Sequence, residues 1–546
     1  MKKNRYFIVW AMSLCCCMAV WAQPQASKSV FKLTTFDKSG TLLSSSLGFF
    51  IGNEGEAVAL WKPFVGADHA VVVDNKGNRM EVDALLGANE IYNVCKFRIK
   101  GTGIPVSLAS TSVAGAKASL VGYSTGKAKT KDVKIEKAEQ FMNKYNYYVV
   151  NASQEDLKGC PVIDKTGQVL GIYDISGSPS VTDVRLTTEF KLSGLSINDN
   201  LLRTSGIRVA MPTDANDALL MLTLSSEQTD SSRHAAYVDD YIHLFPKESE
   251  GYSQKALLYV NAHRFDAADS VMNEAIAKVD DKAGAHFDFS KLIYQKDIYL
   301  SDFPYEKWNL DKALQEATEA YRLNPLPLYR HQQAQIVYAQ GKYQQAHDLF
   351  IELTKDAKFR NGELFLEASS CKRQLKAAPQ EILALLDSAV NCQKMDASAA
   401  VFLLARGQQY DQMGEYRNAL IDYNRYDSLT QGRANDAFFY ARYGCELSLH
   451  QYQQALNDIA HAIVLNRQVP AYYAEMAQLQ VIVKHFADAI KTADLGLSVF
   501  PDYIDLYLVK GQALVLDGKK EEGLAELQKA KDKGSQKAIE LMEKYK

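Results

Sequence analysis

The C-terminal part of the chain repeats one pattern of side chains at a nearly constant spacing. In five copies, Phe or Tyr is followed three positions later by Ala, and a further apolar or aromatic residue follows four positions after the Ala. These spacings are helical, and a repeat of about 34 residues indicates stacked helix pairs. The small residues of the pattern are Ala268, Ala313, Ala346, Ala419, Ala455, Ala489 and Gly523, with separations of 45, 33, 73, 36, 34 and 34 residues.

This pattern resembles the tetratricopeptide repeat (TPR), whose unit is two antiparallel helices. The resemblance predicts seven to eight units over residues 249–534, and the separation of 73 residues places a degenerate fourth unit within it. A helical junction is expected before the repeats, over residues 201–248, and a C-terminal capping helix after them, over residues 535–546. The physical reason for the pattern is that Ala or Gly permits the two helices of a pair to approach closely, while the neighbouring aromatic ring fills the space beside them.

Stacked helix pairs form a superhelix with a concave groove that suits extended peptides or partner helices. In the TPR family, the ninth position of each first helix points into this groove. The resemblance places Gln335, Gln408, Gln478 and Gln512 there. Glutamine offers a donor and an acceptor to a peptide backbone, although it is also common on exposed helices. The Lys and Asn arrangement with which some TPRs bind a C-terminal carboxylate is not present, so we expect other protein or peptide partners.

Residues 27–200 alternate short apolar runs with turn signals, which is typical of an all-β domain. Three stretches resemble trypsin-like serine proteases. Gly48–Gly66 is similar to the region leading to the catalytic histidine, Asn93–Ile99 to the strand of the catalytic aspartate, and Gly159–Ile172 to the nucleophile turn and the strand after it. The resemblance implies a multidomain protein, with an all-β trypsin-like double barrel followed by an all-α TPR superhelix.

The same alignment places Lys62, Asn93 and Lys158 at the histidine, aspartate and serine positions of the protease triad. A serine nucleophile needs a base to accept its proton and a third group to orient that base. Lysine and asparagine supply neither the hydroxyl nor the imidazole. His69 lies seven positions beyond the histidine position, and Cys160 has no aligned histidine to act as its base. We therefore expect a pseudoprotease without catalytic residues; the alternative is an active exported peptidase whose substrates the repeats recruit.

The first 22 residues have the layout of a cleaved secretory signal. Three basic residues precede an apolar run over residues 6–21, which ends on Val20-Trp21-Ala22. An uncleaved anchor is the alternative, but the run is shorter than the ~20 residues that a membrane-spanning helix usually needs. We expect an exported protein without an integral membrane segment after signal removal, with the periplasm as its location and the outer surface or the medium as alternatives.

Composition and cysteine spacing argue against nucleic acid, metal ions and cofactors as ligands. The 62 Lys and Arg residues are balanced by 65 Asp and Glu residues, so no nucleic-acid partner is expected. The cysteines beyond the signal show no Cys-x-x-Cys spacing of the kind that holds zinc or forms a redox pair. No metal and no cofactor are therefore expected. These cysteines, namely Cys95, Cys160, Cys371, Cys392 and Cys445, are predicted to be buried free thiols, with a Cys371–Cys392 disulfide as the alternative.

Overall fold

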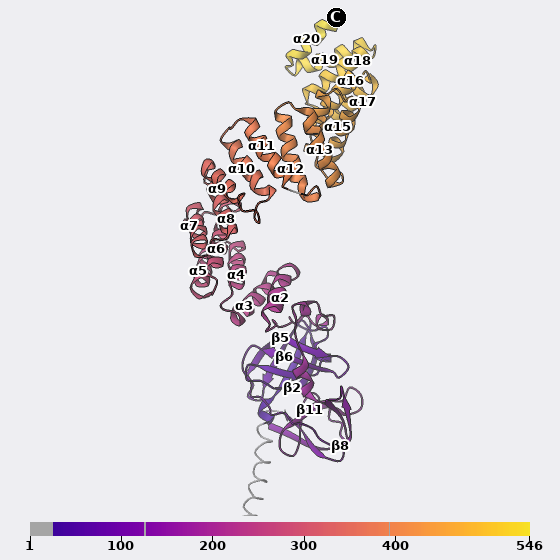
Figure 1. Cartoon of the computed structure of the whole chain (residues 1–546). Helices are drawn as coiled ribbons and strands as arrows, with labels where there is room; N and C mark the ends of the chain where they lie inside the picture. The colour runs from indigo at the N-terminus through magenta and orange to yellow at the C-terminus, as the bar shows by residue number, and fades with distance from the viewer. Residues whose placement is uncertain (1–25, 125–126, 393, 546) are drawn as a thin grey trace, which may run out of the picture. The chain divides into compact units, whose positions relative to one another are not determined.

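The computed structural model describes residues 26–124, 127–392 and 394–545 (Figure 1). The predicted signal segment, residues 1–22, lies outside this part. The chain divides into two compact units, residues 1–285 and residues 286–546. The first unit contains two β-barrels and the helices that follow them, and the second consists of helices.

The first barrel is closed by six antiparallel strands in the order β1-β2-β3-β6-β5-β4. Its core contains Phe31, Phe50 and Phe97, whose rings contact one another at centroid distances of 4.8 and 6.0 Å. The strands are β1 (Val30–Phe36), β2 (Leu42–Phe50), β3 (Glu56–Ala59), β4 (His69–Asp74), β5 (Arg79–Asn89) and β6 (Val94–Ile99).

The second barrel is also closed by six antiparallel strands, in the order β10-β11-β12-β9-β8-β7. Its core cluster extends to Leu47, Phe49 and Val58 of the first barrel, so the two barrels share an apolar interface. The all-β double barrel predicted from the sequence is confirmed. The strands are β7 (Lys117–Ser124), β8 (Lys127–Phe141), β9 (Tyr145–Val150), β10 (Pro161–Ile163), β11 (Val169–Asp174) and β12 (Ser180–Thr182).

Two helices, α2 (Ala215–Gln228) and α3 (Ser231–Leu244), pack against the first barrel and extend its core. Asp214 caps α2 by accepting hydrogen bonds from the amides of Asn216 and Asp217, which is why the helix begins there. Polar contacts reinforce the packing. Arg208 donates to Asp83 of β5 at 2.8 Å and to Asp240 of α3 at 2.6 Å. The barrel and these helices therefore form one body.

The remaining helices alternate as first and second members of pairs, so the predicted all-α region is confirmed. Each helix of the second unit packs mainly on its neighbours along the chain. The pairs are α4 (Ser249–Asn261) with α5 (Phe265–Lys278), α6 (Lys282–Tyr299) with α7 (Leu310–Leu323), α8 (Pro327–Ala339) with α9 (Tyr343–Leu353), α10 (Gly362–Gln374) with α11 (Pro379–Asn391), α12 (Ala400–Gln412) with α13 (Tyr416–Thr430), α14 (Asp436–Ser448) with α15 (Tyr452–Leu465), α16 (Pro470–Ile482) with α17 (Phe486–Val499) and α18 (Ile504–Leu516) with α19 (Lys520–Asp532), before a final helix, α20 (Gln536–Tyr545).

Small residues set the distance between the helices of a pair. A Cβ atom added to Gly407 of α12 would lie 2.8 Å from the ring of Tyr423 in α13, and one added to Gly511 of α18 would lie 2.9 Å from the carbonyl oxygen of Gly523 in α19. Both distances are shorter than van der Waals contact, so only glycine fits. The loop between α6 and α7 is longer than the turns inside the other pairs, and its Trp308 is buried.

The turns inside the pairs share one backbone conformation. Gly341, Gly414 and Gly518, which follow α8, α12 and α18, have φ angles of 76°, 73° and 88°. The corresponding turn in four other pairs uses a residue with a side chain at positive φ: His263 (55°), Lys376 (54°), His450 (58°) and Lys484 (64°). Glycine alone therefore does not identify these turns in the sequence.

The five cysteines of the described residues are all free. Cys95, Cys160, Cys371 and Cys445 are buried, as predicted, but Cys392 is exposed. The prediction of a buried thiol is thus wrong for Cys392, because this residue ends α11 at the surface. The structure has no Cys371–Cys392 disulfide.

Candidate functional site

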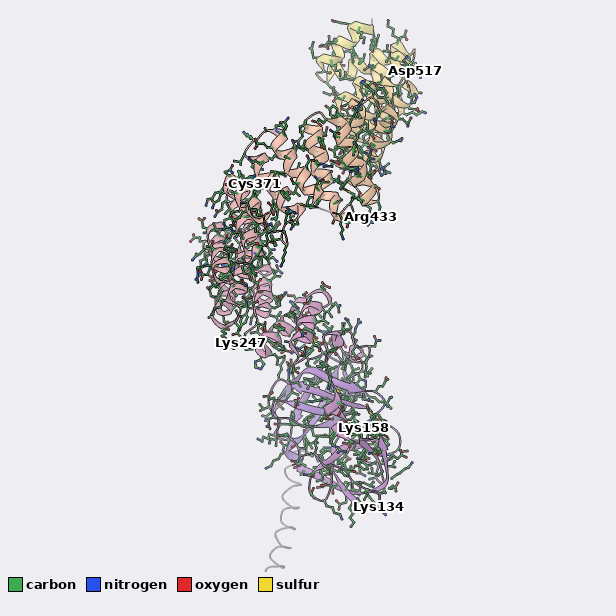
Figure 2. All side chains as sticks on the ribbon, in the orientation of Figure 1. Lys134, Lys158, Lys247, Cys371, Arg433 and Asp517 are labelled. Carbon is green, nitrogen blue, oxygen red and sulfur yellow. The ribbon has the colours of Figure 1, made fainter. Side chains whose placement is uncertain are left out.

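The structure brings two of the three triad positions into one hydrogen-bonded chain at the junction of the barrels. Asn93, in the turn before β6, is buried and accepts a hydrogen bond through Oδ1 from the backbone amide of Lys62 at 2.9 Å. Its Nδ2 donates to Oδ2 of Asp174, at the end of β11, at 2.8 Å. The third position, Lys158, lies in the turn before β10 (Figure 2), and its charge acts on Asp174.

Asp174 is the acidic centre of this junction. Its other oxygen, Oδ1, accepts hydrogen bonds from the amide and the hydroxyl of Ser176 at 2.9 and 2.8 Å. Burial by itself would raise the pKa of Asp174, but the hydrogen bonds from Asn93 and Ser176 and the positive charge of Lys158 outweigh it and lower that pKa. Asp174 is therefore a carboxylate at neutral pH. Sequence reasoning missed it, although it ends a strand that had been aligned with the protease fold.

The backbone amides at the serine position and directly after it are already hydrogen-bonded. The amide of Lys158 donates to the carbonyl oxygen of Glu155 at 3.2 Å, and the amide of Gly159 donates to the carbonyl oxygen of Tyr173 at 2.9 Å. An oxyanion hole needs such amides to point at the reacting oxygen. Gly159 also has a φ of 85°, and an added Cβ would lie 2.2 Å from the carbonyl oxygen of Leu47. The turn therefore packs closely against the backbone of β2 in the first barrel.

The two other candidates for catalysis lie in unsuitable surroundings. Cys160 is fully buried, and this burial raises the pKa of its thiol far above the ordinary value. A thiol with a raised pKa is a poor nucleophile because the thiolate is the reactive form. His69 is half-exposed on β4, where its ring stacks on Phe36 at 5.1 Å and its Nδ1 lies 3.3 Å from Asp68. Among the described residues, the hydrogen-bonded chain through Asn93 and Asp174 includes no histidine.

In the helical unit, Gln335 lines a cavity of about 240 Å³. The cavity is formed by α6, α8, α9 and α10, and it also contains the side chains of Tyr294, Tyr338, Phe350, Glu367 and Ser370. The Nε2 of Gln335 donates to Oε1 of Glu367 at 2.8 Å. Gln335 therefore lines a cavity, as a groove residue should, but its side-chain amide is also hydrogen-bonded to Glu367 of the same unit.

Gln478 and Gln512 line a second cavity together, of about 170 Å³. It lies between α16, α18 and α20, and its polar walls include Glu475, Asp505 and Lys537. Gln408 on α12 is exposed and lines neither cavity. Three of the four predicted glutamines thus border concave surface. Sequence reasoning missed the tyrosines and carboxylates beside them, because the family position pointed only to the glutamines.

No group of His, Cys, Asp and Glu side chains within the described residues could hold a metal ion. Within the same residues, no helix is both long enough and apolar enough to cross a membrane. Neither a protein-family model nor a curated protein matches this sequence.

Proposed function

We propose that this protein is an exported interaction scaffold, in which TPR units bind a peptide or protein partner through the groove of their first helices. The observation that carries the proposal is that Gln335 borders one cavity and Gln478 and Gln512 border another, on first helices of different pairs. An extended ligand that lies across several pairs can use both cavities at once, and stacked helix pairs present such extended surfaces.

We further propose that the double barrel is a trypsin-like domain without catalytic activity, used as a second contact surface. The positions that align with a triad are occupied by Lys62, Asn93 and Lys158. The side-chain amide of Asn93 donates to the carboxylate of Asp174, whereas a triad aspartate would bond the imidazole of the catalytic histidine. The amide of Lys158, at the serine position, is bonded to a backbone carbonyl oxygen, which supports the same conclusion. The alternative, an active peptidase, requires that residues other than these three supply the nucleophile and the base.

A binding experiment tests the groove. The full-length protein is crosslinked in its native envelope and its partners are recovered, in comparison with a Gln478→Arg/Gln512→Arg variant. The control is Gln453→Arg/Gln454→Arg, because these glutamines are exposed on the second helix α15. We expect the groove variant to lose partners that the control retains. Equal recovery by both variants would contradict the groove.

A second experiment tests the barrel. The purified mature protein is incubated with unfolded casein and with a fluorophosphonate probe, and no turnover or labelling is expected. Activity that disappears on substitution of Lys158 or Cys160 would establish the peptidase alternative.

A further inference from the structure

The cavity beside Gln335 has aromatic walls and one carboxylate. Tyr294 of α6, Tyr338 of α8 and Phe350 of α9 supply the rings, and Glu367 of α10 supplies the carboxylate. Aromatic faces attract cations through the negative charge above the ring. A carboxylate next to such rings adds a direct ionic partner, and both features favour a positively charged group.

Glu367 is fixed in place by two neutral or weakly basic donors. Its Oε1 accepts from Gln335 at 2.8 Å, and its Oε2 lies 2.6 Å from Nε2 of His331. The side chain of Glu367 is 21% exposed. Each oxygen keeps a lone pair for another donor, since a carboxylate accepts about four hydrogen bonds. Burial, together with this negative charge, raises the pKa of Tyr294.

The second cavity has a related lining. Glu475 and Asp505 provide two carboxylates, and Tyr503 an aromatic ring. The hydroxyl of Tyr443 donates to Oε2 of Glu475 at 3.1 Å. Burial raises the pKa of Tyr503, and the charges of Asp505 and Glu475 raise it further. Lys537 of α20 is the single basic residue among the described residues that line this cavity, so the acidic groups are in excess.

From this repeated chemistry we propose that both cavities receive cationic side chains, Lys or Arg, of an extended partner segment. The inference rests on the proposed function, because it names the chemistry of the ligand that the groove would bind. A charge-assisted hydrogen bond to Glu367 or Glu475 and contact with the tyrosine rings would hold the cation. The groove glutamines would contact the backbone of the same segment.

The test uses full-length protein and a set of fluorescein-labelled 12-residue peptides with one common backbone sequence. The set carries Lys, Arg, Gln or Glu at two variable positions, whose separation is stepped through the series. Fluorescence anisotropy measures the dissociation constants. We expect the best Lys or Arg peptide to bind about tenfold more tightly than its Gln counterpart, which corresponds to about 1.4 kcal/mol. This difference should shrink at high salt because ionic contacts are screened.

Glu367→Gln and Glu475→Gln should each reduce the difference, because glutamine keeps the shape of the side chain and removes its charge. Glu521→Gln is the matched control, since Glu521 is exposed on the second helix α19 and lines neither cavity. Circular dichroism confirms that each variant is folded. Binding without a preference for Lys or Arg, or a preference that survives both substitutions, would overturn this inference and leave the proposed groove intact. Failure of every peptide to bind would overturn both.

Discussion

The Nδ2 atom of Asn93 lies 2.8 Å from the Oδ2 atom of Asp174 and donates a hydrogen bond to it. The two residues are 81 positions apart, and each belongs to a different barrel. Asn93 is buried, so this bond satisfies a carboxylate that has little access to water on that side. Asn93, which the sequence comparison aligned with a protease aspartate, thus provides an amide that stabilises a carboxylate of the other barrel.

Asn93→Asp should therefore destabilise the double barrel at neutral pH. The substitution removes the donor and places a second carboxylate beside Asp174, and two such groups repel each other. Asn93→Ala adds no charge, but it removes both the donor to Asp174 and the acceptor of the Lys62 amide, and each buried group left without its partner costs about 1–3 kcal/mol. Urea unfolding followed by near-ultraviolet circular dichroism should show that Asn93→Asp loses stability relative to Asn93→Ala as the pH is raised from 4 to 7, because both carboxylates are then ionised. A difference in stability between the two variants that stays constant from pH 4 to pH 7 would disprove the repulsion.

Substitution of two helix glycines by alanine should change the stability of the helical unit in opposite directions. Gly511→Ala should destabilise the helical unit by about 1–3 kcal/mol, because the new methyl group would meet the carbonyl oxygen of Gly523 at 2.9 Å. Gly444→Ala in α14 meets nothing within 4 Å and should stabilise the unit by up to about 1 kcal/mol, because Ala is the better helix former. Thermal unfolding at 222 nm measures both. A shift of the same sign in the two variants would contradict the close approach of α18 and α19.

The turns with a side chain at positive φ should tolerate glycine well. Lys484 has a φ of 64°, a conformation that is unfavourable for residues other than glycine. Lys484→Gly should therefore stabilise the unit by up to about 1 kcal/mol. Gly518→Ala, at the corresponding turn, should destabilise it by a similar amount, although an added Cβ has open space there. Hydrogen exchange of the flanking helices α16 to α19 would report both changes. Slower exchange in Gly518→Ala than in the unsubstituted protein would refute the argument.

Glu446 should make the stability of the helical unit depend on pH. Burial, and then the negative charge of Asp458, raise the pKa of Glu446 from 4.5 to about 7 against the opposing effect of Arg442. The folded state therefore holds this proton more tightly than the unfolded state does. The resulting stabilisation is complete below pH 4.5 and is lost as the pH rises toward 7, by an amount of the order of 3 kcal/mol at about 1.4 kcal/mol per pKa unit.

Glu446→Gln should remove this dependence, because glutamine stays neutral. The variant should match the unsubstituted protein near pH 4.5 and exceed its stability at pH 8, as measured by urea unfolding at both values. If the two proteins lose stability in parallel over this range, Glu446 is ionised in the folded state and the prediction is wrong.

The helix pairs could be predicted in detail because their signals are local. The aromatic residue and the Ala of each copy are three positions apart, so one helix presents both on the same face whatever the rest of the chain does. The turns at His263, Lys376, His450 and Lys484 escaped prediction, because their positive φ is imposed by the packing of the two helices and not by the residue type.

The sequence by itself determined that an all-β part is followed by paired helices, and it has no histidine at the three positions that align with a protease triad. Only the tertiary structure decided what those positions contact. Closure of two barrels placed Asp174 against Asn93, and stacking of α8 on neighbouring helices placed Glu367 against Gln335. These partners are 81 and 32 residues apart and lie on different elements, whereas the helix and strand periods relate side chains of a single element. Periodicity orders side chains along one element, whereas a site requires several elements to meet, and that depends on how their apolar faces pack.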